Sequence, residues 1–278
     1  MDLTTVTDWR TPRGETDLEL ATGEAFLAGG TWLFSEPQEH LRGLVDLTAL
    51  GWPDVEPLPD GGLRIAATCT IATLQRAPWP PATADVVRSC ADALLMSPKV
   101  QESATVGGNI CLGLPAGAMI SLFAGLGASA VIRTGPGLAA ERTEPVASLV
   151  SGPGRTRLAT GELLRAVEVP ASALRAPVAF ARTSLTERGR SAAVVVGRRD
   201  PDAVVLTLTA STPRPVLLRL PVQGGEAAIT PAALTEALRA VAWYDDQHGA
   251  ADWRAAMTGL LVERVVADLA AQHSGPRR

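Results

Sequence analysis

Two pairs of adjacent glycines constrain this chain more than any other feature, because each pair removes two Cβ atoms from one turn. The first pair lies in Ala28-Gly29-Gly30-Thr31 and the second in Ala104-Thr105-Val106-Gly107-Gly108-Asn109-Ile110. Glycine adopts positive φ and lets a ligand approach the backbone, so that N–H groups can point at an anion. Threonine hydroxyls and the Asn109 amide add donors. Either pair by itself is also typical of an ordinary turn, but two such turns facing each other predict a phosphate or diphosphate site.

The first half of the chain alternates short apolar runs with loops. The apolar run before Gly29 predicts a buried strand over residues 25–28, so that the first turn directly follows a strand. Other predicted strands cover residues 44–47, 62–67, 130–132 and 165–169. Helices are predicted from the cap at Thr70 to Gln75, between Pro81 and Pro98, and over residues 115–126. The remaining segments predict an extended start over residues 1–20 and loops over residues 51–62 and 150–160.

The second half has a different pattern. Four β-rich runs, over residues 178–183, 192–198, 203–210 and 216–220, are separated by short turns and predict an antiparallel meander. Two helices follow, over residues 231–241 and 251–271. Residues 170–177 predict a linker, so we expect an α+β fold with one domain over residues 1–172 and another over residues 173–278.

Composition limits the classes of partner and cofactor. The chain has 278 residues, 46% hydrophobic and 19% charged, with a net charge of −4, which argues against a nucleic-acid partner. No apolar run is long enough to span a membrane and the first residues lack a secretory pattern, so we expect a cytoplasmic protein. Its cysteines, Cys69, Cys90 and Cys111, predict neither a metal site nor an iron–sulfur cluster, which takes four ligands. Cys111 either lines the ligand site or is a buried structural thiol.

Catalytic side chains are sparse. The three histidines, His40, His248 and His273, fall at predicted surface or terminal positions, and none is matched to a Ser and Asp as in a triad. The sequence contains neither a Walker-type loop nor a Gly-x-Gly-x-x-Gly fingerprint. We therefore predict no catalytic side chain and expect a bound cofactor to supply the chemistry.

The two glycine turns belong to a longer resemblance. Together with Leu44-Val45-Asp46-Leu47, Pro115-Ala116-Gly117, Gly161-Glu162-Leu163-Leu164 and Trp253-Arg254, they resemble the FAD-binding medium subunit of the molybdenum hydroxylases, the xanthine dehydrogenase and carbon monoxide dehydrogenase family. The resemblance implies a p-cresol methylhydroxylase-type FAD-binding domain, made of two α/β subdomains, followed by an antiparallel sheet with helices. It also implies an iron–sulfur small subunit and a molybdopterin large subunit as partners, with electrons passing through FAD to NAD, oxygen or a quinone.

The resemblance also implies roles for particular residues. The two turns, from Ala28 to Trp32 and from Ala104 to Ile110, would hold the diphosphate of FAD. Leu163 and Leu164 either pack near a ring of the cofactor or are plain core residues. Arg182 occupies a basic position that reaches the flavin in relatives, and it is otherwise a solvated arginine on an edge strand. Trp32 either shapes the flavin pocket or fills the core.

The chain departs from the family at two places. Ala118 stands where an acidic residue commonly bonds a ribose hydroxyl of FAD, and Gln101-Glu102 replaces a basic residue and an asparagine. We therefore expect weakened or rearranged ribose recognition. Two alternatives stay open, a free-standing FAD-dependent oxidoreductase and a flavin-free scaffold that only assembles its partners.

Overall fold

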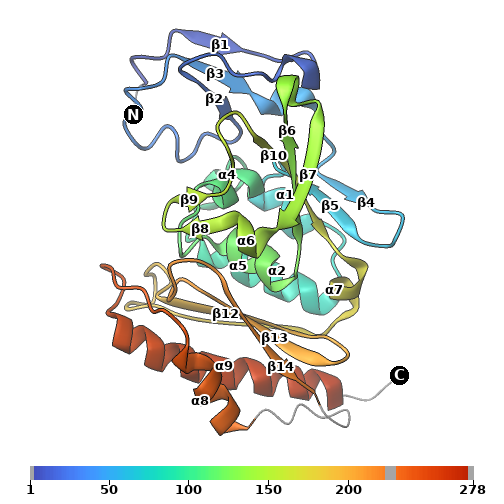
Figure 1. Ribbon diagram of the computed structural model, residues 1–278, viewed down its shortest axis with the longest axis vertical. Helices are drawn as coiled ribbons and strands as arrows, with labels where there is room; N and C mark the ends of the chain where they lie inside the picture. The colour runs from blue at the N-terminus through green and yellow to red at the C-terminus, as the bar shows by residue number, and fades with distance from the viewer. Residues whose placement is uncertain (1–2, 223–229, 275–278) are drawn as a thin grey trace.

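Three parts of the molecule are stacked along its long axis in the computed structural model, which describes residues 3–222 and 230–274. Figure 1 shows a small N-terminal sheet, a central sheet with its helices, and a C-terminal sheet backed by two further helices. This arrangement confirms the predicted α+β fold class, in which an antiparallel sheet with helices follows the first two parts.

The N-terminal sheet presents the first glycine turn. Its three parallel strands lie in the order β1 (Asp8–Arg10), β3 (Gly43–Asp46) and β2 (Glu24–Leu27). Leu44 and Val45 of β3 are both buried, and since successive side chains of a strand point to opposite faces, the middle strand is covered on both sides. The chain leaves β2 directly into Ala28 and Gly29, as predicted. Strand β1 lies in the segment for which only extended chain was predicted.

The central sheet is antiparallel throughout. Its strands lie in the order β4 (Val55–Pro57), β5 (Leu63–Ala66), β10 (Leu163–Val169), β6 (Ser129–Thr134) and β7 (Ala140–Pro145). Strands β5, β6 and β10 confirm the predicted ones. Strand β4 lies where a loop was predicted, and β7 was missed because its mostly exposed, charged residues show no apolar alternation.

Helices cover one side of this sheet and carry the second glycine turn. Between β5 and β6 the chain forms α1 (Ile71–Arg76), α2 (Pro81–Ala93), α3 (Pro98–Gln101), α4 (Val106–Cys111) and α5 (Ala118–Gly125). Thr70 caps α1 as predicted, since its hydroxyl accepts a hydrogen bond from Thr73 N. Pro98 does more than end a helix, because it begins α3 at the position where proline is favoured.

Short elements complete the first two parts. The predicted loop over residues 150–160 contains a hairpin, and the predicted linker over residues 170–177 contains a helix. Their bounds, with those of the remaining short helices, are α6 (Val146–Leu149), β8 (Val150–Gly152), β9 (Arg155–Thr156), α7 (Ala171–Arg175), η1 (Glu15–Asp17), η2 (Leu47–Leu50) and η3 (Pro136–Leu138).

The C-terminal sheet is the predicted meander. Strands β11 (Val178–Thr183), β12 (Ala193–Arg199), β13 (Ala203–Thr209) and β14 (Val216–Pro221) pair antiparallel in chain order. Helices α2 and α5 cover one face, and α8 (Pro231–Arg239) and α9 (Ala251–Ser274) lie on the other (Figure 1). None of the helices in the described ranges combines the length and apolar character that crossing a bilayer requires.

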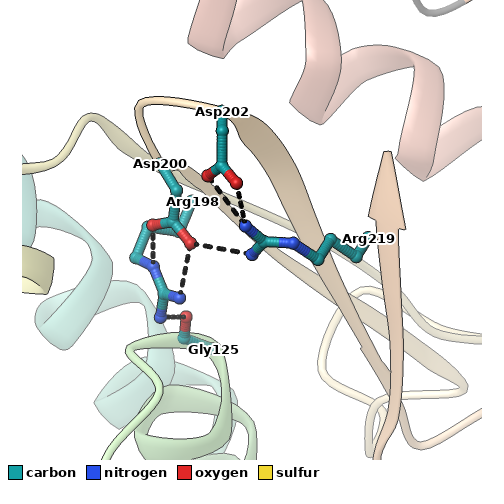
Figure 2. Close-up of polar contacts among 5 residues, drawn as sticks. All are labelled: Gly125, Arg198, Asp200, Asp202 and Arg219. Atoms are coloured by element: carbon teal, nitrogen blue, oxygen red, sulfur yellow. Dashed lines mark hydrogen bonds and ion pairs between the residues drawn. The ribbon is translucent and has the colours of Figure 1, made fainter. Parts of the chain in front are cut away.

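A charged network joins the C-terminal sheet to α5 (Figure 2). Arg198 donates to the carbonyl of Gly125 at the C-terminus of α5 (3.0 Å), where a cation is favoured by the helix dipole. Its other nitrogens donate to Asp200 (2.7 and 3.0 Å), and Arg219 bonds both Asp200 and Asp202. Burial by itself raises the pKa of Asp200, but the two arginines outweigh burial and hold that pKa below its ordinary value. The pairing fixes how the C-terminal sheet meets the central helices.

Candidate functional site

A cavity of about 990 Å³ lies where the three parts of the molecule meet. Both glycine turns line it, together with segments from the central sheet and the C-terminal part, within residues 26–33, 93–117, 153–164, 190–210 and 244–254. Its volume is at the upper end of the range for small-molecule and cofactor sites. The predicted juxtaposition of the two turns is therefore present in the fold.

The first glycine turn offers a row of free backbone donors. Among the described residues, no acceptor bonds the N–H groups of Gly29, Gly30, Thr31 or Trp32. Gly30 has a φ of +68°, in the left-handed region that favours glycine. The carbonyls of this turn are the groups that are bonded: Gly30 O accepts from Phe34 N (2.9 Å), and Trp32 O accepts from Ser35 N (2.9 Å) and Ser35 Oγ (2.8 Å). Successive free N–H groups in such a turn make a concave site for an anion.

Gly29 brings the two turns together. A Cβ on Gly29 would lie 1.7 Å from the carbonyl oxygen of Ser103, just before the second turn. Any other residue would therefore force the two turns apart. The requirement for glycine here comes from a backbone in another part of the chain, which the sequence pattern alone does not reveal.

The second glycine pair differs from the prediction. It lies in the first turns of α4, and both N–H groups donate within the chain: Gly107 N to Ala67 O (2.8 Å) and Gly108 N to Thr105 Oγ1 (3.1 Å). The expectation that these two groups point at an anion is wrong in this structure. Gly107 is needed for packing instead, because a Cβ there would lie 2.5 Å from Ala67 Cβ.

Side chains supply the donors that remain at the second turn. Thr105 Oγ1 accepts the cap from Gly108 N, which leaves its own proton to donate. Asn109 Oδ1 accepts from Met119 N (3.1 Å), and its amide nitrogen has no acceptor within the described chain. Because Gly117 offers no side-chain cap to α5, Asn109 performs that task from α4. Ala118 is buried and does not line the cavity.

The predicted ring-contacting residues line the cavity. Leu163 and Leu164 are both buried core residues and both contribute to its wall, so the two interpretations of them are compatible. Trp32 is half-buried, lines the cavity and belongs to none of the core clusters found among the described residues. The guanidinium of Arg190 lies 5.9 Å from its ring centroid.

Two predicted site residues lie elsewhere. Ile110 is fully buried in the main core and does not line the cavity. Arg182 does not line the cavity either. Its guanidinium donates to Ser184 Oγ (3.1 Å) and Gly189 O (3.0 Å), which holds the turn between β11 and β12. The arginine that the fold brings to the cavity is Arg190.

Sequence reasoning missed most of the C-terminal wall. Its polar members are Arg190, Ser191, Asp246, Gln247, His248 and Arg254. Arg254 is 1% exposed, donates to the carbonyls of Ala210 (3.1 Å) and Tyr244 (3.2 Å), and pairs with Asp246. A charged residue on the apolar face of the last helix was the available signal. No local pattern marks the loop that carries His248, which lines the cavity although a surface position was predicted.

An ion pair fixes one edge of the cavity. Glu162, which lines it, accepts two hydrogen bonds from Arg142 (2.8 and 2.6 Å) and one from Ala159 N (2.9 Å). The Arg142 hydrogen bonds lower the pKa of Glu162 to about 2, despite its partial burial. Glu162 is therefore ionised at neutral pH, and its charge is already paired.

The cysteines divide into two kinds. Cys69 and Cys90 are buried, and burial raises the pKa of Cys69 to about 12, so that it stays a thiol. Cys111 is exposed as a residue and lines the cavity, but desolvation of its sulfur raises the pKa of its thiol to about 12, so that it also stays a thiol. In the part of the chain that the structure describes, no three His, Cys, Asp or Glu side chains are grouped to hold a metal ion.

Comparisons with known proteins show which family and which solved structures this chain is similar to. A sequence profile described as the FAD-binding domain in molybdopterin dehydrogenase matches residues 18–172. Quinoline 2-oxidoreductase from Pseudomonas putida 86 contains a similar chain, with a TM-score of 0.81 at 18% identity over 99% of this chain and 100% of that chain. CO dehydrogenase from Oligotropha carboxidovorans gives 0.79 at 24% identity over 95% and 97%. CO dehydrogenase from Hydrogenophaga pseudoflava gives 0.78 at 22% over 97% and 99%.

These structural likenesses concern the fold. A search of curated protein sequences found no match to this chain.

Proposed function

Because the chain belongs to the family of FAD-binding domains of molybdopterin dehydrogenases, we propose that it is the FAD-binding electron-transfer subunit of a molybdenum hydroxylase complex. The membership confirms the resemblance expected from the sequence, and FAD is the cofactor of that family. The observation that carries the proposal for this chain is the row of free N–H groups from Gly29 to Trp32, at the wall of a cofactor-sized cavity.

The first turn would hold the diphosphate of FAD. Four neutral backbone donors suit an anion that must be bound without a cationic side chain, because each donates a charge-assisted hydrogen bond. The second turn would contribute the Thr105 hydroxyl and the Asn109 amide, while Gly107 and Gly108 keep these side chains in place through packing and capping. Ala28 and Ala104 complete the lining of the two turns.

The rest of the cavity would hold the rings and the ribose. Leu163 and Leu164 provide an apolar surface for one ring. An acidic ribose partner is absent at Ala118, and the two carboxylates that line the cavity among the described residues, Glu162 and Asp246, are already paired with Arg142 and Arg254. Ribose recognition therefore relies on backbone or neutral groups, as the sequence departure predicts.

When bound, FAD supplies the redox chemistry by accepting and passing on electrons. Electrons would come from an iron–sulfur small subunit, itself supplied by a molybdopterin large subunit, and leave to NAD, oxygen or a quinone. Within this chain we assign two domains: residues 1–172 would bind the diphosphate, and residues 173–278 would close the cavity.

Titration of the purified full chain with FAD tests the proposal. We expect stoichiometric binding with flavin absorbance that stays with the protein on filtration, and competition by ADP, which carries the same diphosphate. Protein that retains no FAD after filtration overturns the proposal and favours the flavin-free scaffold.

Turnover by the isolated chain distinguishes the electron-transfer subunit from the other alternative, a free-standing FAD-dependent oxidoreductase. An electron-transfer subunit should bind FAD but show no steady turnover with small organic donors, because its substrate chemistry lies on another chain. Steady turnover without partners would favour the free-standing oxidoreductase.

A further inference from the structure

A buried hydroxyl on the C-terminal wall of the cavity has no partner. Ser191 is 2% exposed and lines the cavity, and its Oγ has no hydrogen-bond partner in the described chain. Its backbone is fixed, because the next residue, Ala192, donates from its N–H to Thr183 O (2.8 Å) at the start of the β11–β12 pairing. Buried polar groups in native proteins are nearly always paired, so an unpaired one at a cavity wall indicates a group that a ligand satisfies.

The neighbouring charges favour an electron-rich ligand at this wall. Asp246 is neutralised by Arg254, whose side chain is almost fully buried. Arg190 has no carboxylate partner among the described residues, and its guanidinium faces the Trp32 ring across the cavity. The wall thus offers one unpaired hydroxyl and one unpaired cation, which suits carbonyl oxygens and ring nitrogens.

The first two parts of the molecule contribute an apolar group of lining residues, Phe26, Leu158, Leu163 and Leu164. Of the two rings of FAD, the flavin carries two carbonyls and several ring nitrogens along one edge, whereas adenine carries no carbonyl. The polar C-terminal wall therefore matches the flavin ring, and the apolar group of lining residues matches adenine.

We propose that Ser191 Oγ forms a hydrogen bond with the polar edge of the flavin ring, so that the C-terminal part contributes directly to the cofactor site. The inference rests on the proposed function, since it requires FAD in this cavity. Ser191 is then a binding and positioning residue, supplied by a segment outside the range that the family profile matches.

Ser191→Ala tests the inference in the full chain, with FAD and ADP as separate probes. ADP lacks the flavin ring, so Ser191→Ala should weaken FAD binding by about five- to tenfold, the value of one hydrogen bond, and change ADP binding less than about twofold. The absorbance bands of bound FAD should shift, because a bond to the ring edge is lost. The cofactor-free variant should melt no lower than the wild type, because an unpaired buried hydroxyl has been removed.

Thr83→Val is the matched control. Thr83 is also fully buried with an unpaired hydroxyl, but it lies on α2 and does not line the cavity. Its replacement should leave both affinities and the flavin bands unchanged. A similar change in Thr83→Val and Ser191→Ala would overturn the inference, because the effect would then come from the core.

The outcomes separate this inference from the function on which it rests. If wild-type protein binds no FAD, both the role of Ser191 and the proposed function are overturned. Wild-type protein that binds FAD, with Ser191→Ala giving the same FAD affinity and the same absorbance bands, overturns the role of Ser191 and leaves the proposed function intact. An equal loss of FAD and ADP affinity also overturns it, since Ser191 would then act at the adenosine end. If ADP binds too weakly to measure, the absorbance bands decide.

Discussion

The two glycine turns look alike in sequence but do different things in the fold. Within the described part of the chain, the first leaves four consecutive N–H groups without acceptors, whereas the second uses the N–H groups of Gly107 and Gly108 inside the chain. Part of the difference is where the threonine stands. Thr31 follows its glycines, while Thr105 precedes Gly108 by three residues, which is the spacing of a helix N-cap. The other part is a distant backbone, because Gly107 N donates to Ala67 O. A glycine pair is therefore a candidate anion site only when neither a capping side chain nor a packed backbone carbonyl takes its donors.

Of the substitutions in the two turns, Gly29→Ala should reduce FAD affinity the most. Its Cβ would lie 1.7 Å from Ser103 O, so one of the two turns must move. Overpacking of this kind costs about 1–3 kcal/mol or more, which predicts a loss of FAD affinity of about 100-fold. Titration with FAD measures it.

The control for this change is Gly14→Ala, at an extended residue (φ −177°) with nothing within 4 Å of the added Cβ. Equal FAD affinities for the two variants would mean that the turns need not approach each other.

Gly107→Ala and Gly108→Ala separate packing from capping in the second turn. A Cβ at Gly107 would meet Ala67 at 2.5 Å, so we expect the free energy of unfolding to fall by about 1–3 kcal/mol. At Gly108 the only close atom is Thr105 Oγ1 at 3.0 Å, and alanine favours the helix by up to about 1 kcal/mol. Urea denaturation measures both. A larger loss for Gly108→Ala would contradict the assignment of Gly107 as the packing glycine.

Replacing each threonine by valine tests their roles directly. Thr105→Val removes the cap of α4 and should lower stability by about 1 kcal/mol, besides weakening FAD binding. Thr31 is exposed, and its hydroxyl has no partner within the described ranges, so Thr31→Val should leave the stability of the cofactor-free protein within about 0.5 kcal/mol. Thermal unfolding checks the contrast, and equal losses would show that the turns are built alike.

The smallest expected effect concerns pH, because the turns themselves use neutral backbone groups that do not titrate. The pKa of Glu162 is lowered from 4.5 to about 2, so the ionised form stabilises the fold. Its contribution is complete above about pH 4.5 and is lost as pH falls towards about 2. The stability difference between wild type and Glu162→Gln should therefore be constant near neutral pH and shrink in that window. If the stability difference between wild type and Glu162→Gln grew on acidification, the ionised form of Glu162 would not be the one that stabilises the fold.

Much of the site was predictable from local sequence. The run before Gly29 predicts β2, and the residues around Leu163 and Leu164 predict β10, so both sides of the cavity were identified. The partners of Arg182 could not be predicted, because an arginine on a strand has many possible acceptors, and only the fold selects the carbonyl of Gly189 for it. No local pattern at Ser191 or His248 marks either of them as a site residue. They line the cavity only because the meander and the loop before α9 return to the turns.

What the sequence determined by itself is the set of local structures: the strands, the helices, their caps and the two turns that glycine permits. These follow from residue type and spacing, since backbone sterics and capping act over a few residues. Only the tertiary structure decided which turn keeps its donors, because Ala67 and Ser103 lie far from the glycines they contact in the chain. Tertiary packing determines which acceptor lies within hydrogen-bond distance of each backbone donor, so local sequence cannot predict which donors stay free.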